Sequence, residues 1–151
     1  MAGLLTKDIL FYLGTATYTA STDSWAFSNY TEVANFYECP SLGGTPEKVE
    51  VTCLKDGSKK YINGLKDYGD LAFKFYYDNS ATTSNFRVLK AAEAAGVAKA
   101  IKIEYPDGTK FEMAAEIAVS TDAAATNNPI TFTCNAALQS DITITNPTLP
   151  E

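Results

Sequence analysis

Apolar and polar residues alternate most regularly between positions 70 and 78. Leu71, Phe73, Phe75 and Tyr77 hold every second position of this stretch. A period of two predicts a β-strand with one face in a hydrophobic core and the other face turned away from it. The positions predicted to face away from the core are Asp70, Ala72, Lys74, Tyr76 and Asp78.

Weaker forms of this pattern predict further strands toward the C-terminus. Residues 98–105 and 109–120 are expected to form a hairpin, because Pro106-Asp107-Gly108 between them favours a tight turn. Residues 129–138 and 141–145 follow as two more strands. In the first of these, the positions expected to face inward are Ile130, Phe132, Cys134, Ala136 and Leu138.

The N-terminal third is less regular. Short strands are predicted at residues 8–13, ended by Gly14, and at residues 30–39, ended by Pro40. The Ser-, Thr- and Ala-rich residues 15–29 between them are expected to form a loop, which Trp25 anchors to the body.

One segment has a helical pattern instead. Residues 85–95 are expected to form a helix of about three turns, with Thr83 or Ser84 at its start and Gly96 at its end. The apolar residues expected near one face of this helix are Phe86, Val88, Leu89, Ala92 and Ala95.

A long polar excursion, residues 40–69, separates the second and third of these strands. Inside it, residues 48–54 alternate, and Asp56-Gly57 is a strong signal for a hairpin turn, after which residues 59–62 can return. Loops of this length in compact domains are usually functional or disordered, and the internal hairpin favours function.

Together these elements predict one domain, residues 1–151, of mainly β structure. The expected architecture is an antiparallel β-sandwich or barrel of about seven strands, with one flanking α-helix and a long β-hairpin loop. The tail at residues 146–151, with two prolines, is expected to be flexible or to dock onto a neighbour.

Composition excludes several kinds of chemistry. The chain has no His, which removes Ser-His-Asp and Cys-His catalysis and imidazole metal ligands. Glu112 and Glu116 would lie about 13 Å apart on one strand, too far for a glycosidase pair. Calcium-binding and phosphate-binding motifs are missing as well. We therefore expect no enzyme activity, no cofactor and no metal.

Charge and cysteine content limit the expected partners and the expected cellular location. The net charge of −6 disfavours attraction to nucleic acid, and Arg87 is the only arginine. Cys39, Cys53 and Cys134 are an odd number with no CxxC pair, so buried reduced thiols are expected. No segment has the length of a membrane span or the pattern of a signal peptide, so synthesis and retention in the cytoplasm of the producing cell are expected.

Three sequence runs resemble a known family. They are MAGLLTK at 1–7, SLGGTPEKVEVT at 41–52, and KYINGLKDYGDL at 60–71, the last followed by Phe73, Phe75 and Tyr77-Asp78-Asn79. These runs, and the order of the predicted elements, are similar to the tail tube proteins of long-tailed phages. The resemblance covers most of the chain, is sharpest at 41–79, and carries no recognisable motif at 14–30 or after 121.

The resemblance implies an assembly. Such subunits form hexameric rings around a continuous inner β-barrel, and the rings stack into the virion tail, with a long loop reaching the next ring. Partners would be further copies and other tail proteins (tape measure, terminator, distal tail protein). DNA would pass through the lumen during ejection without specific binding, and no membrane would take part.

On this interpretation two sets of residues carry the function. The lumen-facing set is Asp70, Ala72, Lys74, Tyr76 and Asp78. The inter-ring loop set is Gly43, Gly44, Lys48, Glu50, Asp56, Gly57, Lys59, Lys60 and Asn63.

Simpler readings stay open at this stage. A polar strand face is often just solvated, and a long polar loop is often just mobile. The alternative function is that of a monomeric β-sandwich module that binds a ligand or decorates a capsid. Whether such a tail contracts is also left open by the sequence.

Overall fold

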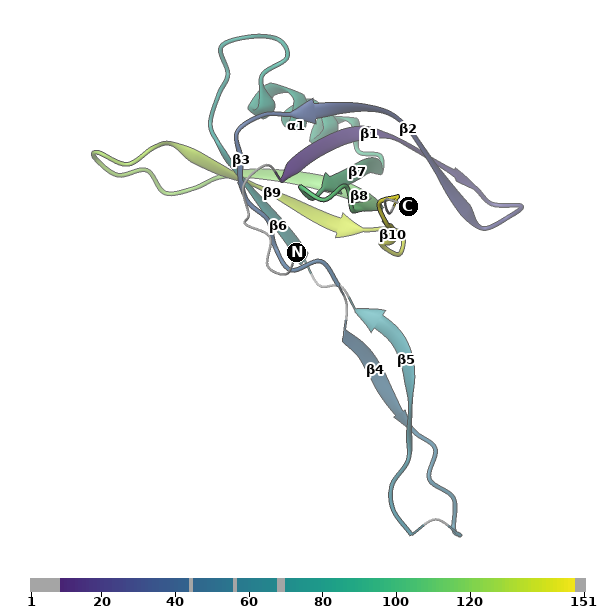
Figure 1. Ribbon diagram of the computed structural model, residues 1–151. Coiled ribbons are helices and arrows are strands. Elements are labelled where there is room, and N and C mark those ends of the chain that lie inside the picture. Colours follow the sequence, from purple (N-terminus) through teal and green to yellow (C-terminus); the bar gives the residue numbers. More distant parts are fainter. Residues whose placement is uncertain (1–8, 44, 56, 68–69, 149–151) are drawn as a thin grey trace.

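The computed structural model describes residues 9–43, 45–55, 57–67 and 70–148. In these residues it contains one helix and ten strands, drawn in Figure 1. The strands are β1 (Leu10–Thr19), β2 (Ser24–Val33), β3 (Phe36–Glu38), β4 (Thr45–Glu50), β5 (Tyr61–Asp67), β6 (Asp70–Tyr76), β7 (Lys99–Glu104), β8 (Lys110–Thr121), β9 (Thr131–Leu138) and β10 (Thr143–Thr145), and the helix is α1 (Asn85–Ala95). The prediction of a mainly β, antiparallel fold with one helix is confirmed.

One curled sheet forms the body. Its strand order is β2-β1-β7-β8-β9-β6-β3, and β10 pairs with the first residues of β8. The chain passes directly from β2, at one margin of the sheet, to β3, at the other margin, through Ala34 and Asn35. Asn35 has the left-handed φ of 65° that this sharp passage needs, and its carbonyl accepts a hydrogen bond from the Tyr76 amide. The two margins are therefore brought round toward each other, as in a sandwich or barrel.

Aromatic side chains fill the space inside the curl. The ring of Phe11 on β1 lies 5.1 Å from the rings of both Phe73 and Phe75 on β6 and 5.5 Å from Phe36 on β3. Phe11, Phe73 and Phe75 are fully buried. Edge-on and tilted contacts of this kind add to the free energy gained by removing the rings from water.

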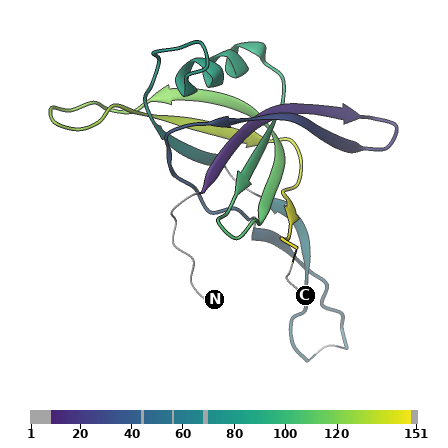
Figure 2. The same cartoon turned by 45° about the horizontal axis from the view of Figure 1, so that its top comes forward.

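Helix α1 covers one opening of the body, as Figure 2 shows. Leu89 and Ala92 are buried against the core, and the Phe86 ring meets Phe132 of β9 edge-on. Ser84 precedes the helix, and Gly96 ends it with a φ of 67°, its amide donating to the Glu93 carbonyl. The helix prediction is confirmed in its bounds, although Ala95 is exposed. Within the described residues no helix is long and apolar enough to cross a membrane.

The predicted loop at residues 15–29 is wrong. This segment belongs to a long hairpin of β1 and β2, because threonine is β-branched and favours extended backbone as well as turns. Gly14 does not end the strand. The pairing register shifts between Leu13 and Thr15, and a Cβ on Gly14 would lie 2.6 Å from the Ser28 carbonyl oxygen, so glycine permits a close approach of the two strands here.

Smaller corrections concern strand ends and cysteines. The strand predicted at 30–39 is divided by the turn at Asn35, and the strand predicted at 70–78 ends at Tyr76. Ile130 precedes β9 and is 56% exposed, rather than inward-facing. Of the three thiols only Cys134 is buried, while Cys53 is exposed and Cys39 is partly covered.

The predicted hairpin inside residues 40–69 is present, with different bounds. Strands β4 and β5 pair as a separate two-stranded ribbon, which we call the arm, with Val49 opposite Ile62. Residues 51–60 lie between the two strands, closed at their base by a hydrogen bond from the Val51 amide to the Lys60 carbonyl. The expected turn at Asp56-Gly57 therefore lies within a wider tip, in which Asp56 is outside the described residues.

Candidate functional site

The face of β6 that points away from the core carries some of the residues that were predicted to face the lumen. Leu71, Phe73 and Phe75 are buried, so the intervening Ala72, Lys74 and Tyr76 lie on the opposite face. Lys74 is partly exposed and Tyr76 is 44% exposed. Asp70 is the first residue of this strand, and its side chain is outside the described part of the structure.

Asp78 does not share this face. It follows the end of β6, and its carboxylate accepts hydrogen bonds from the Ser80 amide at 3.1 Å, the Ser80 hydroxyl at 2.8 Å and the Ser84 hydroxyl at 3.3 Å. The Ser80 and Ser84 hydrogen bonds lower the pKa of Asp78. Asp78 thus orders the turn before α1, which corrects its assignment to the strand face.

Strands β9 and β8 extend the polar face beyond the predicted residues. Their register places Thr133 beside Lys74, and Asn135 beside both Ala72 and Ala118. The alternation within residues 129–138 already required a second face, whose members were not singled out from the sequence. We call the following set the polar wall: Ala72, Lys74, Tyr76, Glu116, Ala118, Ser120, Thr131, Thr133, Asn135 and Ala137.

Asp122 lies at the end of the polar wall and is hydrogen-bonded to two of its threonines. Its carboxylate accepts hydrogen bonds from the hydroxyls of Thr131 at 2.8 Å and Thr133 at 2.7 Å. The hydroxyls of Thr133 and Thr131, with a smaller contribution from Lys74, lower the pKa of Asp122. The carboxylate therefore stays ionised at neutral pH and joins the end of β8 to the start of β9.

A second polar cluster ties the other margin of the sheet to its centre. The Tyr30 hydroxyl on β2 donates to Glu112 on β8 at 2.7 Å. The Lys102 ammonium lies 4.4 Å from the centroid of the Tyr12 ring and 4.5 Å from that of Tyr30, within cation–π range. Burial and the bond to Glu112 raise the pKa of Tyr30, so the phenol remains a donor.

The arm points away from the body (Figure 1). Among the described elements, β4 and β5 make extensive contact only with each other. Its apolar side chains are exposed in consequence: Val49 is 47% exposed, Val51 44%, Tyr61 52%, Ile62 55%, and Leu54 fully. Val49 and Ile62 are paired across the ribbon, so these two exposed apolar side chains lie together on one side of the arm.

The predicted inter-ring residues mostly fall in or beside this arm. Lys48, Glu50, Gly57, Lys59 and Lys60 are exposed. Gly43 precedes the arm in open space, Asn63 is in β5 opposite Lys48, and Gly44 and Asp56 lie outside the described residues. Between residues 48 and 60 there are four lysines and two acids, so this stretch is basic in a chain whose net charge is −6.

Both margins of the body sheet offer backbone for pairing. Strand β2 pairs only with β1, and β3 pairs only with β6, so within the described part of the chain each has one open edge. The pairs between β3 and β6 reach only Phe75 and Lys74, so within the described part of the chain residues 70–73 of β6 have no paired strand on that side. Open strand edges bind other strands unless something blocks them.

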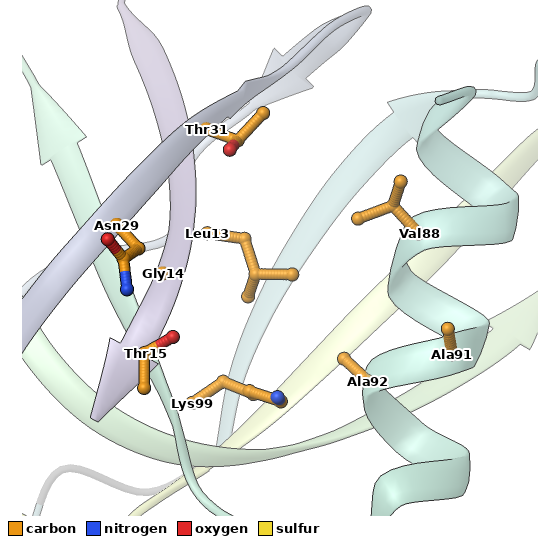
Figure 3. A pocket seen from close by; sticks show the side chains of 9 residues that line it. All are labelled: Leu13, Gly14, Thr15, Asn29, Thr31, Val88, Ala91, Ala92 and Lys99. Carbon is orange, nitrogen blue, oxygen red and sulfur yellow. The ribbon is translucent and has the colours of Figure 1, made fainter. Parts of the chain in front are cut away.

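A groove of about 350 Å³ lies between α1 and the base of the β1–β2 hairpin (Figure 3). Leu13 and Val88 point into it from opposite sides, and Lys99 lies at its lower edge. Its other lining residues are Gly14, Thr15, Asn29, Thr31, Ala91 and Ala92. This lining supplies hydroxyls, one amide and one amine. Elsewhere, too, the described residues contain no group of His, Cys, Asp or Glu that would hold a metal ion.

Comparisons with known proteins give a family and a fold. The family model described as "Phage tail tube protein, TTP" matches residues 2–147. The structure is similar to a chain of the cryo-EM structure of the anti-feeding prophage (AFP) baseplate, 6-fold symmetrised, with a TM-score of 0.66, 10% identity and 99% of each chain covered.

Two further solved structures come from gene transfer agent (GTA) particles. One is the tail of an empty particle, computed with helical refinement in C6 symmetry, at 16% identity, and the other is the virion of the native particle, at 14%. Each has a TM-score of 0.66 and covers 95% of this chain and 99% of the other. At these identities the likeness shows the fold alone. A comparison with curated proteins finds no significant match.

Proposed function

This chain belongs to the phage tail tube protein family, and we propose from that premise that its copies form six-fold rings which stack into a tail tube. It is a structural subunit of such a tube and is located in the virion tail. In the proposed assembly the hollow interior conducts DNA during ejection into the host.

The arm is the observation that carries the stacking proposal. A two-stranded ribbon alone is marginally stable in water, and this one leaves Val49, Val51 and Ile62 exposed. Covering these side chains with a neighbouring subunit removes apolar surface from water and orders the ribbon. An arm that projects beyond the body reaches a copy in the next ring, and this is the role we assign to residues 40–69.

The open edges of β2 and of β3 with β6 support lateral assembly. Two different surfaces on one subunit make a head-to-tail contact, and such contacts close into a ring when the rotation between subunits closes. Closure also removes the edges on which uncontrolled strand pairing would begin. We propose that these margins face neighbouring subunits within a ring.

The polar wall is the proposed lining of the lumen, together with Asp70, and Tyr76, the last residue of β6, stands at the edge of this lining. Its small and polar side chains offer DNA few apolar contacts, and Glu116 adds a charge that repels phosphates. Lys74 departs from that pattern, although Asp122 lies near it and offsets its charge. DNA would pass without specific binding.

Other copies and other tail proteins are the proposed partners. A tape measure protein, a terminator and a distal tail protein would meet the tube inside it and at its two ends. Synthesis in the host cytoplasm, before assembly, belongs to the same proposal. The family is structural, in keeping with a role without catalysis.

A monomeric binding or capsid-decoration module is the second candidate, and the same arm discriminates between them. Purified protein should be followed by light scattering and electron microscopy, with hydrogen exchange of the arm amides. Tubes or stacked rings, with arm exchange slowed on assembly, support the proposed function. A strict monomer at every concentration, with residues 40–69 protected against the body, contradicts it.

A further inference from the structure

The outer half of the β1–β2 hairpin is a projection with two unlike faces. Beyond the register shift at Gly14 it extends past the body, which Figures 1 and 2 show from two directions. Its register pairs Ala16 with Phe27 and Tyr18 with Trp25, so these four side chains share one face. Tyr18 is 48% exposed, and its ring lies 5.1 Å from that of Trp25.

The face of this hairpin that carries Tyr18, Trp25 and Phe27 has two features of an interface core. Residues 15–29 contain a single charged residue, Asp23, although 20% of the whole chain is charged. Asp23 is engaged at the turn, where it accepts a 2.6 Å hydrogen bond from the Tyr18 hydroxyl. Depletion of charge together with Tyr, Trp and Phe is the signature of an interface core. Tyr and Trp are also enriched among the residues that contribute most to binding in interfaces.

A second exposed aromatic pair lies at the other side of the body. Tyr37 on β3 and Tyr76 on β6 stack with their ring centroids 4.4 Å apart, yet they are 41% and 44% exposed. Tyr76 pairs with Thr131, next to the exposed Ile130, which places this surface at the β8–β9 loop end of the sheet. Both views show the β8–β9 loop and the tip of the β1–β2 hairpin on opposite sides of the body.

We propose that the Tyr18–Trp25 face of this hairpin docks onto the Tyr37–Tyr76 surface of the neighbouring copy in the ring. The inference rests on the proposed ring assembly and names its lateral contact. Two unlike surfaces on opposite sides of one subunit suit a head-to-tail ring. The contact also brings the open margin of β2 toward the open margin of β3 and β6, so aromatic packing and edge pairing belong to one interface.

The chain offers a direct readout, because Trp25 is its only tryptophan. Tryptophan emission and acrylamide quenching should be measured for the wild-type monomer and for assembled tubes. We expect the emission to move to shorter wavelength and quenching to fall severalfold on assembly. If tubes form while Trp25 remains as accessible as in the monomer, the docking is wrong and the tube function stands. If no tubes form under any condition, the proposed function fails as well.

A disulfide test identifies the partner surface. Tyr18→Cys and Tyr76→Cys are combined in one chain with Cys53→Ser, and assembled tubes are mildly oxidised. Covalent multimers in steps of one subunit, up to a closed ring, are expected. The matched control combines Tyr18→Cys with Val97→Cys, because Val97 is comparably exposed, at 54%, in the turn after α1. Tubes without multimers, or with equal multimers in the control, overturn the proposal.

Discussion

The Tyr30 hydroxyl donates a 2.7 Å hydrogen bond to the Glu112 carboxylate, joining β2 at the margin of the sheet to β8 at its centre. Strands β1 and β7 lie between them, and the Tyr30 ring passes close to Gly14 on β1. The bond therefore holds four strands in one arrangement. It keeps the open margin of β2, which is the proposed lateral contact, in a defined position.

Tyr30→Phe removes this bond and keeps the ring. Hydrogen bonds to charged groups contribute about 1.5–3 kcal/mol, and a partly exposed one contributes less, so we expect a loss of about 1 kcal/mol in the free energy of unfolding. Urea denaturation measures it. Tyr18→Phe is the matched control, since it removes an exposed tyrosine–carboxylate bond in the projecting hairpin and should cost less. Equal losses in the free energy of unfolding would show that the Tyr30–Glu112 bond stabilises the fold no more than the exposed Tyr18–Asp23 bond does.

Gly14→Ala tests the close approach of β1 and β2. The added Cβ would lie 2.6 Å from the Ser28 carbonyl oxygen and 2.8 Å from the Tyr30 ring, so backbone must move. Overpacking of this kind costs roughly 1–3 kcal/mol, and we expect that loss by urea denaturation. Gly57→Ala meets no atom within 4 Å and should leave stability unchanged. A wild-type midpoint for Gly14→Ala would contradict the packing described.

Deletion of residues 48–62 tests the arm. Strands β4 and β5 contribute little to the body, so the sheet should keep its cooperative unfolding transition. Tube growth should be lost, which electron microscopy would show. Tubes of normal length from the truncated protein would mean that the arm does not join the rings.

Acid pH should weaken the bond network of Asp122. Its pKa is lowered from 3.8 by the Thr133 and Thr131 hydroxyls, so the ionised form stabilises the fold above that value. This stability is lost as the pH falls below 3.8 through the lower pKa of the folded state. Wild type should therefore exceed Asp122→Asn in stability at pH 6, and the difference should shrink in acid. A difference that does not change with pH would rule out this role for the carboxylate.

Regular alternation and turn chemistry predicted much of this fold. The strand at Leu71 to Phe75, the helix ended by Gly96 and the hairpin at Pro106-Asp107-Gly108 all follow local rules that the body does not override. The prediction of a loop at residues 15–29 is wrong, because Thr and Ser favour both turns and strands. Only the pairing of β1 with β2 decides between the two. The prediction of one continuous strand at residues 30–39 is wrong for a similar reason. The run is apolar enough to be continuous, and a turn at Asn35 that depends on tertiary structure divides it.

The functional surfaces were predicted less completely. Alternation identified the face of β6 with Ala72, Lys74 and Tyr76. The predicted strand face also included Asp78, which lies beyond the end of β6 and whose carboxylate orders the next turn. Strand order cannot be read from alternation, so the residues that β8 and β9 add to the polar wall were not identified. The aromatic pair of Tyr37 and Tyr76 depends on pairing of β3 with β6, which brings together distant parts of the chain.

A cryo-EM map of the assembled particle tests the central claim most directly. The account predicts six copies of this chain per ring in the wall of a hollow cylinder. The arm should contact the adjacent ring, and the polar wall should line the channel. A map that places the chain outside such a wall, for example as single copies on a capsid surface, would contradict the account.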